Sequence, residues 1–102
     1  MGRRKVTIFR VGIFGDATVT VKEFVAYQAR EWFTLKLPDG MQEPVARGRD
    51  GEPDYPLMGT TRAKALARAK TWALGRQRRL LQQAAMYEQV VANLEEKEQK
   101  CQ

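Results

Sequence analysis

The first third of the chain has the residue pattern of β-strands. Residues 5–14 are mostly β-branched or aromatic, and a glycine and an aspartate follow as a turn signal. Residues 17–27 continue with threonines placed between valines, which suits a pleated surface. Residues 32–37 supply a further apolar and aromatic run that needs an adjacent partner. The pattern therefore predicts a three-stranded antiparallel β-meander within residues 1–37.

Residues 20–28 also fit a helix. Thr20 and Glu23 have the spacing of a capping box, in which the two side chains bond to the backbone of a helix start. Val21, Phe24 and Val25 would then line one helix face. We favour the strand, because the β-branched residues of this segment are poor helix openers.

Residues 38–59 predict a loop rich in proline and glycine. Pro38 and Gly40 suit the turn that ends the third strand, since proline presets φ and glycine accepts positive φ. Beyond this turn the apolar residues are too few for a core element. A short edge strand over residues 45–49 is the one element that fits here. The loop is expected to be the most mobile part of the chain.

Residues 60–98 have helical periodicity. One of the two threonines Thr60 and Thr61 is the expected N-cap, and an apolar residue recurs every seven positions along the helix. These positions are Leu66, Ala73, Leu80, Tyr87 and Leu94. We expect one long helix from about residue 61 to about residue 97, with a helical hairpin bent at Gly75 as the alternative. The whole chain, residues 1–102, is then a single α+β domain.

The positive charge of the chain is local. Of 18 basic residues, seven lie between Tyr55 and Tyr87, where no acidic residue occurs, and the formal net charge is +6. The cations fall on the side of the predicted helix opposite its apolar stripe or along its borders. A cationic face of this kind attracts phosphate backbones. We therefore predict a non-catalytic protein that binds nucleic acid or a nucleoprotein complex through Lys64, Arg68, Lys70, Arg76, Arg78 and Arg79.

The same cations also fit an ordinary solvated helix, because lysine and arginine are good helix formers and keep a surface soluble. The lack of acidic residues favours a ligand instead. Surface helices usually mix charge signs and so gain favourable pairs four residues apart.

The length of the predicted helix raises a second possibility. A helix of about 37 residues spans roughly 55 Å, whereas strands of nine or ten residues span roughly 30 Å. The sheet cannot cover the whole apolar stripe of one long helix. In the alternative, a helical hairpin bent at Gly75 would bury its own stripe. The exposed part would bind a protein partner or a second copy, as in an adaptor or inhibitor of the type found among accessory proteins of mobile elements. Its predicted interface residues are Ala84, Tyr87, Val90, Val91 and Leu94.

The composition argues against several other functions. The chain has no histidine and no serine, and its one cysteine is Cys101, so the usual nucleophile and base pairs are missing. We therefore expect no catalytic residue, no metal site, no cofactor and no small-molecule ligand. No apolar run is long enough to cross a membrane. A single cysteine also requires no oxidising compartment, which makes the cytoplasm the expected location.

Overall fold

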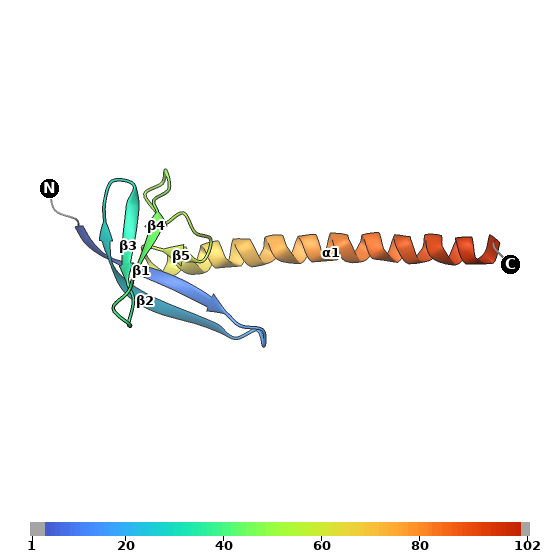
Figure 1. Ribbon diagram of the computed structural model, residues 1–102, viewed down its shortest axis with the longest axis horizontal. Coiled ribbons are helices and arrows are strands. Elements are labelled where there is room, and N and C mark those ends of the chain that lie inside the picture. The colour runs from blue at the N-terminus through green and yellow to red at the C-terminus, as the bar shows by residue number, and fades with distance from the viewer. Residues whose placement is uncertain (1–3, 101–102) are drawn as a thin grey trace. The chain divides into compact units, whose positions relative to one another are not determined.

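The computed structural model describes residues 4–100, so Cys101 lies outside the described part. Five strands precede one helix (Figure 1), in the order β1 (Arg4–Ile13), β2 (Val19–Gln28), β3 (Trp32–Lys36), β4 (Gln42–Ala46), β5 (Met58–Gly59) and α1 (Arg62–Lys100). The predicted α+β class is confirmed. The chain divides into two compact units, Met1–Trp72 and Ala73–Gln102, which we name the first and the second unit.

The first unit contains one antiparallel sheet with the strand order β4-β3-β2-β1-β5. Strands β1 and β2 pair over their whole length, from Arg4 opposite Gln28 to Ile13 opposite Val19. The hairpin is closed by hydrogen bonds in which the Phe14 N–H donates to the Thr18 carbonyl at 3.0 Å and Asp16 Oδ1 accepts from the Thr18 N–H at 3.0 Å. The strand prediction for residues 20–28 is confirmed, and the helix alternative is wrong.

The predicted number of three strands is wrong, because residues 38–59 contain two more. Strand β4 pairs with β3 and forms one edge of the sheet, starting three residues before the expected edge strand. It contains Pro44, a residue that sheets accept at edges because it cannot donate a ladder hydrogen bond. Strand β5 pairs with β1 at only two positions, Phe9 opposite Gly59 and Arg10 opposite Met58. A two-residue strand has too little pattern to be detected in a sequence.

Side chains on the two faces of the sheet join two separate apolar clusters. Because side chains alternate along a strand, Ile8 and Val11 of β1 point to opposite faces. The Ile8 cluster contains the buried residues Ile8, Ala26, Phe33, Leu35, Val45 and Met58. The Val11 cluster contains Val11, Ala65 and Ala69, so the start of α1 packs on this face through alanines. The small alanine side chains bring the helix close to the strands.

The helix begins and continues as the sequence predicts. Thr61 Oγ1 accepts a hydrogen bond from the Lys64 N–H at 3.1 Å, so the expected threonine N-cap is Thr61. One helix runs from Arg62 to Lys100 through Gly75, so the hairpin alternative is wrong. Gly75 does not have the positive φ that ends many helices at a glycine. The residues on either side of it are good helix formers, which outweighs the cost of one glycine.

Candidate binding surfaces

Lys64, the first of the predicted nucleic-acid contacts, lies next to a carboxylate of the first unit. Its Nζ atom is 3.5 Å from Glu52 Oε2. Glu52 is only 9 % exposed and also accepts hydrogen bonds from the Thr60 N–H at 2.9 Å and the Thr60 hydroxyl at 2.5 Å. Burial alone would raise the pKa of the Glu52 carboxyl, but the bonds from Thr60 and the charge of Lys64 together hold the pKa below its ordinary value. The contact stabilises the first unit.

Arg68 has a similar internal role. Its Nη1 atom donates to the carbonyl oxygen of Pro53 and, at 3.0 Å, to that of Met58. Both carbonyls belong to the segment between β4 and α1, so the guanidinium ties this segment to the helix. A charged donor shared by two carbonyls is a strong contact. The assignment of Lys64 and Arg68 to a nucleic-acid surface stays a prediction, but their contacts favour a structural role.

The other predicted nucleic-acid contacts have exposed side chains, and they are divided between the units. Lys70 belongs to the first unit, whereas Arg76, Arg78 and Arg79 belong to the second. Among the described residues, Lys70, Arg78 and Arg79 form no salt bridge. The exposed cations therefore do not form one surface that the structure defines.

The five residues of the predicted protein interface all lie on the second unit and are exposed. We call the larger set of exposed apolar side chains there the apolar row: Leu80, Ala84, Tyr87, Val90, Val91 and Leu94. Apart from the alanine, these side chains are 41–62 % exposed. A hollow of about 500 Å³ is lined by Ala84, Tyr87, Glu88 and Val91. The small Ala84 beside the larger Tyr87 and Val91 gives this helix a surface into which a side chain of another helix can fit.

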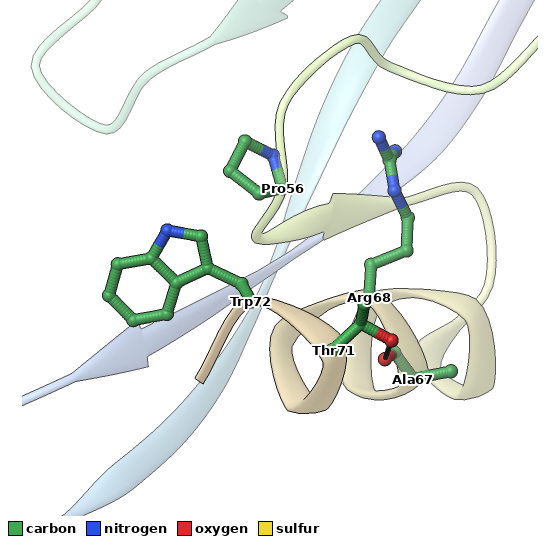
Figure 2. A pocket seen from close by; sticks show the side chains of 5 residues that line it. All are labelled: Pro56, Ala67, Arg68, Thr71 and Trp72. Atoms are coloured by element: carbon green, nitrogen blue, oxygen red, sulfur yellow. Dashed lines mark hydrogen bonds between the residues drawn. The ribbon is translucent and has the colours of Figure 1, made fainter. Parts of the chain in front are cut away.

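A shallow hollow of about 370 Å³ lies on the first unit beside the helix. Figure 2 shows the side chains of Arg68 and Trp72 leaving the helix on either side of the Pro56 ring in this view. Its lining is mostly apolar, and Ala67 and Thr71 complete it. Because Arg68 is already bonded to two carbonyls, this hollow offers apolar contact rather than an available charge.

A third surface, on the β1–β2 hairpin, combines cations with aromatic rings. The register places Arg10 directly opposite Lys22, so both side chains lie on one face of the sheet. Like charges at such a position repel each other. Arg10 also lies 3.7 Å from Glu43, with both side chains partly exposed. Phe14 and Phe24 line the same hollow of about 290 Å³.

Analysis of the sequence missed this hairpin surface. The signal for it is the register itself: the turn at residues 14–18 fixes which residues of β1 and β2 face each other. A cation at position 10 and another at position 22 have no special spacing in the sequence. They become neighbours only because the turn sets the register of the two strands.

No group of three or more acidic, histidine or cysteine residues among residues 4–100 is arranged to hold a metal ion. The helix within these residues is not apolar enough to cross a membrane. Comparisons with protein-family models, curated proteins and solved structures gave no match.

Proposed function

We propose that this chain is a non-catalytic adaptor or assembly protein that binds another polypeptide helix through the apolar row of the second unit. The observation that carries the proposal is the exposure of large side chains such as Tyr87, Val91 and Leu94 along one side of the helix. A contiguous apolar surface of this kind is unusual on a monomeric protein. Its presence favours a partner that covers it.

The stability of the helix supports the same proposal. None of the residues of the second unit that the structure describes is buried. Isolated helices are marginal in water, and helices in proteins gain most of their stability from packing of an apolar face. Association with a second helix would supply the packing that these residues do not find within their own unit.

The proposal predicts that one charge in the apolar row strongly weakens association. Val91→Asp places a carboxylate where apolar contact is expected, and we expect the dissociation constant to rise at least tenfold, since an unpaired charge in such an interface is costly. Gln89→Asp is the control, because it adds the same charge at a position away from the row. Sedimentation equilibrium at several micromolar concentrations measures both effects. Circular dichroism and thermal melting of the first unit show whether the sheet stays folded.

Two measurements together would contradict this function. The wild-type chain would be monomeric at all these concentrations. A pull-down from lysate would also yield no protein that is lost with Val91→Asp. Treating the lysate with nuclease before the pull-down removes partners that are held only through nucleic acid. The cytoplasm remains the location that we propose for this activity.

We propose nucleic-acid binding as the second candidate function. It is favoured by exposed cations such as Arg78 and Arg79 in a stretch without acidic residues, and by the hairpin surface, where Arg10 and Lys22 lie beside aromatic rings. Cations bind phosphates, while aromatic rings stack on bases of single strands. A phosphate between Arg10 and Lys22 would also relieve their mutual repulsion.

This second candidate predicts a binding constant that falls steeply with salt. For single strands the slope of log K against log salt is about −0.7 for each phosphate contact, so Arg78→Ala with Arg79→Ala should make it less steep by about 1.4. Fluorescence anisotropy with a labelled single-stranded oligonucleotide measures the slope. Lys97→Ala with Lys100→Ala is the matched control, because it removes the same charge from an acidic stretch. Binding that is absent, or insensitive to salt, would exclude this function.

A further inference from the structure

The apolar row follows the spacing of a coiled coil. Five of its residues, Leu80, Ala84, Tyr87, Val91 and Leu94, recur at alternating intervals of four and three residues on the helix of the second unit, and Gln77 extends this spacing towards the N-terminal end. This spacing produces a narrow seam that packs against one other helix. The seam occupies most of the second unit, so the partner must be a helix of similar length.

The charges of the second unit are separated along its length. Residues 73–87 contain three arginines and no acidic residue, a formal charge of +3. Residues 88–100 contain four glutamates and two lysines, a formal charge of −2. Two copies that run antiparallel place the positive half of each beside the negative half of the other. Arg78 and Arg79 lie on the side of the helix away from the seam, so this attraction acts at longer range and without direct ion pairs. Two parallel copies would place halves of like charge side by side, which is unfavourable where salt does not screen the charges.

The sizes of the side chains in the seam favour the same direction. An antiparallel pair with its twofold axis between residues 85 and 86 brings Ala84 of one copy against Tyr87 of the second copy. It also brings Leu80 against Val91 of the second copy. A parallel pair would match Ala84 with Ala84 and Tyr87 with Tyr87, which leaves a void in one layer and crowds the next. It would also bring two Glu98 side chains together.

The antiparallel registers that are shifted by one heptad are less favourable than this one. A shift by one heptad in one direction places Glu98 against Leu80 of the second copy. The opposite shift places Lys70 against Leu94 of the second copy. Each shift sets a charge against a leucine, which is costly, whereas the chosen register sets Glu98 against the small Ala73 and the uncharged Gln77 against Leu94. In the chosen register the axis lies near the middle of residues 73–100, so almost the whole unit takes part.

From the exposed seam, the charge separation and the matched sizes, we infer that the occupant of the apolar row is a second copy of this chain, paired antiparallel through residues 73–98. The inference rests on the proposed protein-binding function and names its partner. At 1.5 Å per residue, the two Ala73 residues are then separated by about 37 Å along the pair, so the first units are attached at opposite ends.

Spin labels test the direction of the pair in the full chain. Cys101→Ser removes the native thiol, and Gln99→Cys or Gln82→Cys then carries the label. In the antiparallel pair the two labels at position 99 are about 27 residues apart along the axis, about 40 Å. The labels at position 82 are about seven residues apart, which with the width of the pair gives a distance below about 25 Å. A long distance at position 99 with a short one at position 82 is the expected result.

Each other outcome overturns the inference in a distinguishable way. Short distances at both positions show a parallel pair, and the protein-binding function then stands without this inference. If the chain is monomeric but captures a protein that is lost with Val91→Asp, the partner is a different protein. The protein-binding function then again stands without this inference. A monomer that captures nothing contradicts both.

Charge reversal gives a second measurement that does not depend on the labels. Arg78→Glu with Arg79→Glu removes the attraction between opposite halves of an antiparallel pair, so the dissociation constant should rise. The same change would lower it for a parallel pair, because the like charges at the N-terminal halves are reduced. The rise should shrink as salt is added, since exposed charges are screened. A tighter dimer would overturn the inference.

Discussion

Gly59→Ala should lower the free energy of unfolding of the first unit by about 3 kcal/mol, the upper part of the range for overpacked sites. A methyl group at this position would lie 2.6 Å from the Ala65 nitrogen and 3.1 Å from its Cα atom. Both are backbone atoms of the first helical turns, so they cannot move away as a flexible side chain can. The added group would force β5 and α1 apart. Urea denaturation followed by circular dichroism measures the change.

Gly15→Ala is the matched control for this substitution. Gly15 lies in the turn between β1 and β2, and a methyl group there meets no atom within 4 Å. We expect its free energy of unfolding to stay within about 0.5 kcal/mol of the wild type, as for other exposed positions. An equal loss for both variants would show that Gly59 matters for backbone freedom and not for the close approach of α1.

The first hairpin was predictable because its pattern is long and its pairing is complete. Strands β1 and β2 each contain ten residues, and every one has a partner on the other strand. The capping-box spacing of Thr20 and Glu23 is a local signal of helix start. Ten paired residues contribute more than one cap, so the strand prevails.

The two short strands were not predictable for different physical reasons. Strand β4 contains a proline and has only one neighbouring strand, so its sequence has little of the pattern of a buried strand. Strand β5 depends on tertiary contact, because its two residues pair with β1 only after the chain has returned to it. A short strand of this kind follows from the fold and not from its own residues.

The helix shows what periodicity can and cannot predict. The seven-residue repeat gave its extent and its continuity through Gly75 correctly. The distribution of charged residues along the sequence did not reveal which cations would contact carboxylates or carbonyls of the chain itself. Lys64 and Arg68 contact Glu52 and two carbonyls of a segment that appeared in the sequence as a loop. The partners of a cation depend on how a distant loop folds back, which no spacing rule provides.

Glu52→Ala should cost about 2–3 kcal/mol, the usual contribution of hydrogen bonds to a charged group. The substitution leaves the Thr60 N–H and hydroxyl without their acceptor and removes the charge next to Lys64. Lys64→Met removes the ion pair alone. Because the Lys64 side chain is 57 % exposed, its loss should cost less than about 1 kcal/mol. Urea denaturation at pH 7 compares the two variants with the wild type.

The pH dependence of stability separates the charge of Glu52 from its size. The pKa of this carboxyl is lower in the folded chain than its ordinary value of 4.5, so the folded state binds the proton less readily than the unfolded state. Its stabilising contribution is complete above pH 4.5 and is lost as the pH falls through the folded-state pKa. The stability difference between wild type and Glu52→Gln should therefore shrink from pH 6 towards pH 3, while the other carboxyls, common to both chains, cancel. A difference that stays constant over this range would mean that the bonds to Thr60 need only an oxygen acceptor, and that the cation at Lys64 is available to a ligand after all.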